Sequence, residues 1–159
     1  MSGLDVLVGG GCSGLDVANA AANHGQSVGV VEKGPLGGTC LNRGCIPSKQ
    51  LLYHADVVET IERADEYDID ATVDGVDFAT IVRTVNEDVG GDAASIRRGL
   101  ESADSHTLYA GEGRFVGDRT LEIVDGDDTG ARVRADTVLI AAGTRPSIPD
   151  VDGIEAVEY

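Results

Sequence analysis

Residues 4–14 read LDVLVGGGCSG, an apolar run followed by a glycine-rich turn. Gly9, Gly11 and Gly14 form the pattern G-x-G-x-x-G, which is typical of a β-strand, a phosphate-binding turn and an α-helix in that order. Glycine lets the turn form, lets backbone amides approach a pyrophosphate and lets the helix pack closely on the strand, while the helix N-terminus favours the anion. The stretch therefore predicts the first strand, turn and helix of an α/β unit that binds a dinucleotide.

The residues after the turn support this interpretation. Small apolar residues recur at helical spacing, at Val17, Ala18, Ala21 and Ala22. Gly25 is placed to close the helix, and a second apolar strand over residues 27–31 ends at Glu32. An acidic residue about 20 positions beyond the glycines is where a Rossmann unit binds the adenosine ribose hydroxyls. An ordinary tight strand-to-helix turn is the alternative, and the position of Glu32 favours the dinucleotide.

A second informative stretch is GGTCLNRGCIPSK, residues 37–49, in which Cys40 and Cys45 lie five positions apart. On a regular helix this spacing separates two residues by about 7.5 Å along the axis, beyond the usual disulfide Cα separation of about 4.4 to 6.8 Å. Gly44 supplies conformational freedom, and Pro47 is expected to bias Ile46 away from helical geometry, so the backbone is expected to bend here.

The spacing alone allows three uses for this cysteine pair. One is a redox-active disulfide, since a ring of six residues stabilises a fold by only about 2 kcal/mol and exchange chemistry is the better use of it. Another is a pair of reduced, half-buried cysteines. The third is a metal site with His54 as a further ligand.

The same stretch resembles the active-site signature of the pyridine nucleotide-disulfide oxidoreductases, the flavoenzyme family of dihydrolipoamide dehydrogenase, glutathione reductase, mycothione reductase and mercuric reductase. The resemblance implies that Cys40 and Cys45 form the redox-active disulfide. Cys45 would lie nearer the flavin, Cys40 would be the interchange thiol that attacks a disulfide substrate, and Lys49 would lie beside the flavin and tune it. Cys40, Cys45 and Lys49 are therefore the candidate catalytic residues, and no resident metal is expected.

The resemblance further implies FAD at the first glycine turn and NAD(P)H as the co-substrate of the full-length enzyme. The candidate FAD-binding residues are Gly9, Gly11, Cys12, Ser13, Gly14, Glu32, Lys33, Gly38, Thr39, Lys49, Gly113, Ala142 and Gly143. For Cys12 the alternative is a small residue packed near the turn, with no catalytic role. Gly113 lies in a stretch that would pass the FAD adenine. Residues 137–146, TVLIAAGTRP, resemble the second FAD signature of the family and are expected to form a buried strand that ends at a glycine turn.

Within the family, Leu41, Ile46 and Ser48 favour a dihydrolipoamide dehydrogenase-like enzyme that acts on a dithiol or disulfide small molecule or a lipoyl group. Arg43 departs from the family pattern, which commonly has a small apolar residue there. A low-molecular-weight thiol disulfide reductase and a mercuric reductase are the alternatives. From other classes, the alternatives are a non-catalytic flavin-binding or redox-sensing module and a Cys/His metal-binding module.

The rest of the chain predicts an α/β fold: a Rossmann-like FAD-binding domain with a parallel sheet, long helices after the redox disulfide and a small antiparallel β-meander. The expected segments are an amphipathic helix over 49–64, an acidic connection over 65–75, a helix over 78–102 with a kink at Gly90 and Gly91, and the meander over 107–138. We expect residues 1–147 to be the first segment of the FAD-binding domain. Residues 148–159 would begin the connection to an NAD(P)-binding domain, so the chain resembles a truncated N-terminal portion of an enzyme whose full-length form is a homodimer.

The composition narrows the partners. The 159 residues include 28 acidic against 12 basic residues, a formal net charge of −16, which argues against nucleic acid and anionic membrane surfaces. Such an excess of acid is expected of a salt-adapted, halophilic protein, because counter-ions screen the self-repulsion. The sequence shows no apolar run long enough for a transmembrane span and no secretory signal, and these observations predict a cytoplasmic protein.

Overall fold

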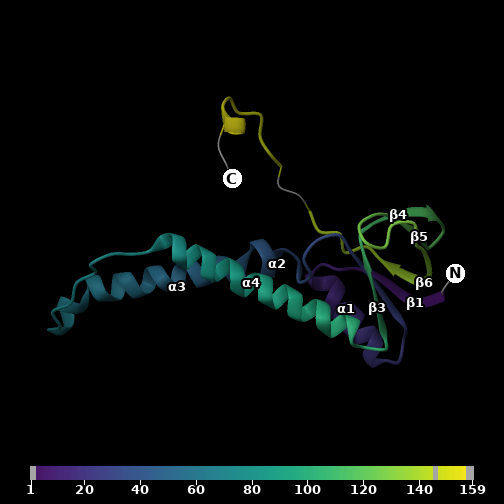
Figure 1. The fold of residues 1–159 in the computed structure, drawn as a ribbon, viewed down its shortest axis with the longest axis horizontal. Helices are drawn as coiled ribbons and strands as arrows, with labels where there is room; N and C mark the ends of the chain where they lie inside the picture. Colours follow the sequence, from purple (N-terminus) through teal and green to yellow (C-terminus); the bar gives the residue numbers. More distant parts are fainter. Residues whose placement is uncertain (1–2, 145–146, 157–159) are drawn as a thin grey trace.

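A computed structural model describes residues 3–144 and 147–156 of the chain (Figure 1). The elements in chain order are β1 (Gly3–Gly9), α1 (Cys12–Asn23), β2 (Val28–Glu32), α2 (Gly38–Arg43), α3 (Cys45–Glu62), the 3₁₀ helix η1 (Ala64–Tyr67), α4 (Phe78–Glu101), β3 (His106–Ala110), β4 (Glu112–Gly117), β5 (Thr120–Asp125), β6 (Arg132–Leu139) and the 3₁₀ helix η2 (Ile154–Ala156). The predicted strand, glycine turn, helix and second strand are β1, α1 and β2.

The strands form one sheet in the order β3-β2-β1-β6-β5-β4. β1 pairs in parallel with both β2 and β6, and β2 pairs in parallel with β3. The antiparallel part consists of β4, β5 and β6. The parallel sheet and the antiparallel meander are thus both present, as predicted. The meander begins later in the chain than expected. The start of the range 107–138 is β3, which extends the parallel sheet because Val30 pairs with Leu108.

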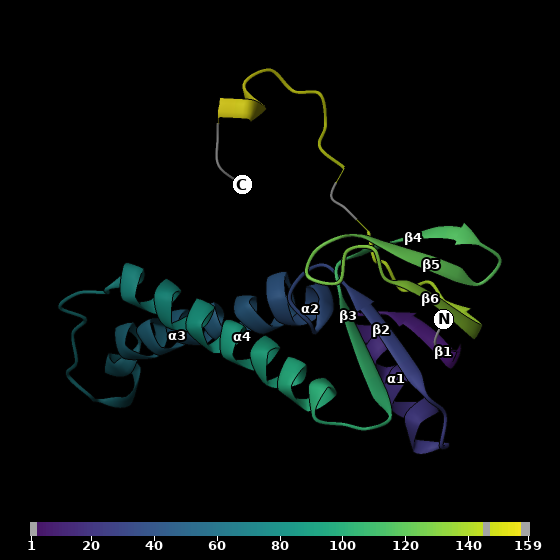
Figure 2. The same cartoon turned by 45° about the vertical axis from the view of Figure 1, so that its right-hand side comes forward.

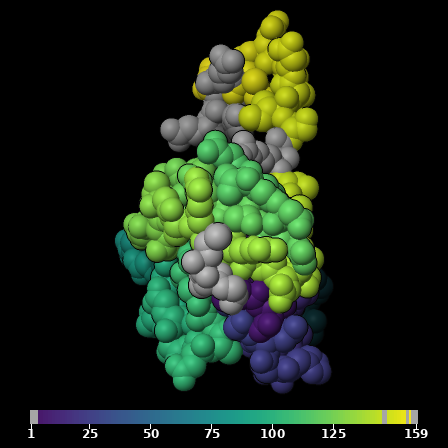
Figure 3. Space-filling model, turned by 90° about the vertical axis from the view of Figure 1, so that its right-hand side faces the viewer, coloured from purple at the N-terminus to yellow at the C-terminus, as the bar shows by residue number. Residues whose placement is uncertain are grey.

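Both faces of the sheet are covered. On one face, α1 and α4 pack against β1 and β2 in a core of Val6, Val8, Leu15, Ala18, Ala21, Val28, Val30, Leu36 and Leu100. On the other face the antiparallel strands fold over β1 in a core of Leu4, Leu7, Leu121, Val133 and Ala135. Figure 2 shows β4 and β5 lying away from α1, and Figure 3, which looks at the sheet end, shows the C-terminal segment rising beyond these strands. The central strands β1 and β2 are therefore largely apolar, as buried strands require.

Helices α3 and α4 form a long antiparallel hairpin that projects from the sheet (Figures 1 and 2). No residue of α3 is buried, whereas α4 buries Val85, Val89, Ala93 and Leu100. The expected kink at Gly90 and Gly91 does not interrupt α4, which is one continuous helix from Phe78 to Glu101.

The junction of α2 and α3 corrects one expectation and confirms another. Gly44 separates the two helices with φ −126° and ψ −128°, so the chain departs from regular helix between the cysteines, as predicted. The second helix begins at Cys45 rather than Lys49, and Ile46 and Pro47 lie in its first turn. The expectation that Pro47 keeps Ile46 out of a helix is wrong. In the first turn a proline removes no intrahelical hydrogen bond, because the amide there has no partner to lose.

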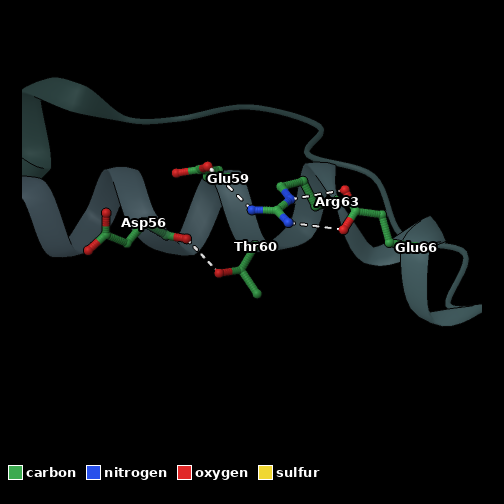
Figure 4. A network of polar contacts seen from close by, with 5 residues as sticks. All are labelled: Asp56, Glu59, Thr60, Arg63 and Glu66. Atoms are coloured by element: carbon green, nitrogen blue, oxygen red, sulfur yellow. Dashed lines mark hydrogen bonds and ion pairs between the residues drawn. The ribbon is translucent and has the colours of Figure 1, made fainter.

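The far end of α3 is fixed by polar contacts of Arg63, shown in Figure 4. Arg63 donates to both carboxylate oxygens of Glu66, at 3.1 and 3.0 Å, and lies 3.8 Å from Glu59. The hydrogen bonds that Arg63 donates to Glu66 raise the pKa of Arg63 above its ordinary value. One turn earlier, the Thr60 hydroxyl donates to the carbonyl of Asp56 at 2.7 Å. These exposed contacts mark where α3 ends and the acidic connection begins.

The stretch 137–146 is only partly the buried strand expected. β6 runs from Arg132 to Leu139, so the strand begins and ends earlier than predicted, and Ile140 is 72% exposed. The reason is that the last ladder pair joins Val8 to Leu139, after which β1 enters its glycine turn and leaves no partner. Residues 145–146 of this stretch and 157–159 of the expected connection lie outside the described residues.

Candidate functional site

The carboxyl ends of β1, β2 and β6 meet at a cleft of about 470 Å³, which we call the strand-end cleft. Parallel strands of a doubly wound sheet bind ligands at this edge. Of the candidate FAD-binding residues, this cleft is lined by Gly9, Glu32, Lys33, Gly113, Ala142 and Gly143. Residues from four distant parts of the sequence therefore lie around one cavity.

Close backbone packing shapes the glycine turn beside the strand-end cleft. A Cβ atom on Gly14 would overlap the carbonyl oxygen of Gly9, and a Cβ atom on Gly11 would lie 2.9 Å from the carbonyl oxygen of Ala141. The glycine turn therefore admits no side chains at these positions, and it brings the segment after β6 directly against the turn. Close packing of the helix on the strand at a glycine turn is typical of a dinucleotide-binding unit.

Glu32 lies at the end of β2, half-buried, on the wall of the cleft. Its Oε1 accepts a hydrogen bond from the backbone N–H of Gly34 at 2.8 Å, which fixes the carboxylate. Gly10 packs against this side chain so closely that a Cβ atom there would overlap the Cβ of Glu32. The carboxylate is thus held beside the glycine turn, the position expected of a group that accepts ribose hydroxyls.

An ion pair links the two sides of the cleft. Lys33 Nζ lies 2.8 Å from Glu112 Oε2, and both side chains are about half exposed. Next to Glu112 in the chain, a Cβ atom on Gly113 would lie 3.0 Å from Val31 Cγ1. The absence of a side chain at Gly113 therefore lets β4 lie close over β2.

A second cavity of about 620 Å³ lies on the other face of the sheet, among α1, α2, α3 and α4, and we call it the helix-side cleft. Its lining is mostly apolar and includes Leu15, Leu41 and Ile46. Cys12 and Cys40 also line it. Among the described residues none lines both clefts.

The two predicted catalytic cysteines lie on either side of the α2–α3 junction as free, exposed thiols. Cys45 Sγ donates to the carbonyl oxygen of Cys40 at 3.9 Å. A Cβ atom on Gly44 would lie 2.7 Å from the Thr39 carbonyl oxygen and 3.0 Å from the Cα of Cys40, so only glycine lets the two helices meet this closely. A hydrogen bond with the Cys45 side chain, followed by desolvation and the charges of Cys45 and Cys12, raises the pKa of Cys40.

The metal-site alternative gains no support from this geometry. Within the described ranges, no group of three or more His, Cys, Asp and Glu side chains is placed to hold a metal ion. His54 instead has its Nδ1 2.8 Å from the carbonyl oxygen of Gln50, one turn earlier in its own helix.

Several candidate residues line neither the strand-end nor the helix-side cleft: Gly11, Ser13, Gly14, Gly38, Thr39, Cys45 and Lys49. Lys49 is exposed on α3, and within the described part of the chain it makes no hydrogen bond or ion pair. Gly38 has φ +66° and packs against the backbone nitrogen of Cys12, so α2 begins beside the start of α1.

Sequence reasoning did not single out Gly10, Phe115 and Ala141, which also line the strand-end cleft. The unbroken triplet of glycines was a signal for Gly10. The pattern of apolar and polar residues in β4 did not indicate that the Phe115 side chain would line this cavity while half exposed.

Residues 5–159 match the pyridine nucleotide-disulphide oxidoreductase family. The chain belongs to this family. The predicted resemblance is thereby confirmed, and members of the family are flavoprotein oxidoreductases that use FAD and NAD(P)H. The candidate cysteines and the strand-end cleft are the features of the chain that bear on this chemistry.

Curated relatives carry more than one activity. The chain is 34% identical to a mercuric reductase of Streptomyces lividans over 96% of its own length and 32% of the relative's. It is 36% identical to a dihydrolipoyl dehydrogenase of Bacillus subtilis, over 88% and 31% respectively. A glutathione reductase of Burkholderia cepacia is 29% identical, over 92% and 31%. The chain therefore spans about a third of the length of the family members it matches.

A solved structure has the same fold. The Cu(II) complex of the HOCl-induced flavoprotein disulfide reductase RclA from Escherichia coli superposes with a TM-score of 0.79 at 23% identity, over 98% of this chain and 32% of that one. Within residues 3–144 and 147–156 of the present chain, every helix is too short or too polar to cross a lipid bilayer.

Proposed function

We propose that this chain carries the FAD-binding and disulfide parts of an NAD(P)H-linked disulfide oxidoreductase that is dihydrolipoamide dehydrogenase-like. The single observation that carries the proposal is the placement of two cysteines across the Gly44 junction, next to the glycine turn that starts the strand-end cleft. Residues 1–147 would form the cofactor-binding unit, and residues 148–159 would lead toward an NAD(P)-binding domain.

The strand-end cleft fits a flavin dinucleotide. The pyrophosphate would lie at the turn formed by Gly9, Gly11 and Gly14, whose close packing on the backbone of Gly9 and Ala141 leaves no room for side chains. The Glu32 carboxylate, fixed by Gly34, would accept the adenosine ribose hydroxyls. Bound FAD supplies two-electron redox chemistry between a nicotinamide and the cysteine pair. We propose that Lys49 contributes a positive charge to the flavin from α3.

The thiol chemistry belongs to Cys40 and Cys45. In the reductive direction, the Cys40 thiolate attacks one sulfur of a disulfide substrate, the substrate S–S bond breaks, and the first substrate thiol leaves with a proton from solvent. The Cys45 thiolate then attacks Cys40 Sγ, which releases the second thiol and leaves the Cys40–Cys45 disulfide. With a dithiol substrate the same steps run in reverse. Cys40 suits the interchange role because it lines the helix-side cleft, where a substrate can approach.

The substrate class rests on the wall around Cys40. Leu41 and Ile46 line the same cleft, whose surface is mostly apolar and suits an aliphatic dithiol such as a lipoyl group. A mercuric reductase-like activity is the second candidate, because a mercuric reductase aligns with 96% of the chain.

The test is the visible absorption spectrum of the purified chain with FAD supplied, before and after stoichiometric reduction by a dithiol. We expect a bound flavin band that gains a long-wavelength shoulder on reduction, because a cysteine thiolate then lies against the flavin. Cys45→Ser should lose this shoulder, and the matched Cys40→Ser variant should keep it. A flavin band that the dithiol leaves unchanged would instead indicate a non-catalytic flavin-binding module, and stoichiometric zinc without flavin would indicate a metal-binding module.

A further inference from the structure

The third cysteine of the chain, Cys12, follows the glycine turn but lines the helix-side cleft. It is the first residue of α1, directly after the glycine turn, and its thiol is free and exposed. Cys12 lines the helix-side cleft, together with Cys40, and does not line the strand-end cleft. A residue predicted to bind the cofactor therefore lies on the proposed substrate side.

The starts of α1 and α2 are in direct contact, which brings Cys12 toward Cys40. Gly38 begins α2 two residues before Cys40, and a Cβ atom on Gly38 would lie 3.3 Å from the Cβ of Cys12 and 2.5 Å from its backbone nitrogen. The charge of Cys12 is also one of the influences that raise the pKa of Cys40. Cys40 thus has Cys45 across the α2–α3 junction, and it shares the helix-side cleft with Cys12 across the α1–α2 contact.

We propose that Cys12 is a second resolving thiol, which competes with Cys45 for the sulfur of Cys40. This proposal rests on the proposed function, since it requires Cys40 to be the interchange thiol. After Cys40 has formed a mixed disulfide with a substrate thiol, the Cys12 thiolate attacks Cys40 Sγ. The mixed S–S bond breaks, a Cys12–Cys40 disulfide forms, and the substrate thiol leaves as a thiolate that takes a proton from solvent.

The step needs no further oxidant or reductant, because one disulfide is exchanged for another. The proton of Cys12 passes to solvent, which the exposure of this thiol allows. The new disulfide lies on the substrate side, and Cys45 stays reduced. The chain would therefore possess two oxidised forms with different disulfides, one across the α2–α3 junction and one across the α1–α2 contact.

The test uses the Cys45→Ser chain, in which only Cys12 and Cys40 remain. We would add one equivalent of 5,5′-dithiobis(2-nitrobenzoate) at low protein concentration and record both the released coloured thiolate and the intact mass. Closure of a Cys12–Cys40 disulfide should release two equivalents of thiolate and leave a product lighter by two hydrogens. The double variant Cys12→Ser, Cys45→Ser should release one equivalent and keep the adduct.

A stable adduct on the Cys45→Ser chain would overturn the proposal. So would equally fast closure in Cys40→Ser, which retains Cys12 and Cys45, because the exchange would then not depend on the α1–α2 contact. The Cys12→Ser chain, which retains Cys40 and Cys45, tests the proposed function separately: failure of that pair to close removes the interchange role itself. Peptide mapping of the oxidised wild-type chain, where a Cys12–Cys40 peptide is expected beside the Cys40–Cys45 peptide, keeps the proposal testable if a variant does not fold.

Discussion

The sheet with its glycine turn and the α3–α4 hairpin differ in how they are held. In the sheet, Leu7, Val28 and Ile123 are at most 1% exposed, because helices cover one face and antiparallel strands the other. In the hairpin, no residue of α3 is buried, and Leu52 is 58% exposed. Both regions show regular apolar periodicity in the sequence. Periodicity therefore predicts which face of an element is apolar, and only the packing decides whether this face is buried.

The largest expected effect uses a matched pair of leucines. Leu7→Ala should lower the free energy of unfolding by about 2 to 5 kcal/mol, because it leaves a cavity among residues that cannot fully close it. Leu52→Ala on α3 should change it by less than about 0.5 kcal/mol, since the side chain is already mostly in water. Urea unfolding of both chains without FAD measures the difference. Equal losses would mean that the hairpin is held as firmly as the sheet.

A matched pair of glycines should give the next largest effect. Gly14→Ala should destabilise the chain by about 1 to 3 kcal/mol, because the new Cβ meets the carbonyl oxygen of Gly9, which the sheet holds in place. Gly91→Ala, in the exposed middle of α4, has no atom within 4 Å of the new Cβ and should stabilise the chain by about 0.5 to 1 kcal/mol. Thermal unfolding midpoints should move in opposite directions.

The same two glycine variants should differ in their affinity for FAD. Gly14→Ala should also weaken FAD binding, because the turn that would hold the pyrophosphate is displaced. Gly91→Ala should leave the affinity unchanged, since α4 does not line the strand-end cleft. Loss of affinity in both chains would instead place the cofactor outside this cleft.

The smallest effect concerns pH and the start of the hairpin. Asp77 caps α4 by accepting from the Thr80 N–H at 3.0 Å and the Thr80 hydroxyl at 2.7 Å, and these bonds hold the pKa of Asp77 below its ordinary value of 3.8. A lowered pKa means that the fold favours the carboxylate. The stabilisation is therefore present above pH 3.8 and is lost as the pH falls through the lowered value.

Asp77→Ala should accordingly lower the unfolding midpoint at neutral pH, by less than Gly14→Ala does, because it removes the cap. The difference from wild type should shrink on acidification below pH 3.8, which urea unfolding at a series of pH values measures. In the sheet, hydrogen bonds from Ser27 lower the pKa of Asp5 in the same way. Asp5→Ala is therefore the matched comparison, and its effect on stability should shrink on acidification as well. A difference for Asp77→Ala that does not vary with pH would show that the cap acts without its charge.

Much of the fold was predictable because its signals are local. The glycine turn, helix α1 and strand β2 follow from residues within one strand–helix–strand unit. Gly25, with φ +79°, lies just after the end of α1, as expected. The boundaries that failed depend on partners distant in sequence. β6 ends at Leu139 because β1 ends at Gly9, and β3 belongs to the parallel sheet because β2 lies beside it.

The candidate site divides in the same way. The sequence placed Glu32 at the end of β2 and the cysteines around a glycine, since each depends on short spacing. It did not indicate that Phe115 would line the strand-end cleft, because β4 reaches that cavity only by folding over β2.

The sequence by itself determined the glycine turn, the acidic residue at the end of the second strand and the bend between the two cysteines, because local sterics and hydrogen bonding specify each of them. The tertiary structure alone decided which side chains share a cavity. It placed both Cys12 and Cys40 on the helix-side cleft and Ala141 against Gly11, through contacts between segments that are far apart in the chain. Such contacts depend on how the helices and strands pack on the two faces of the sheet, and no spacing along the chain encodes that packing.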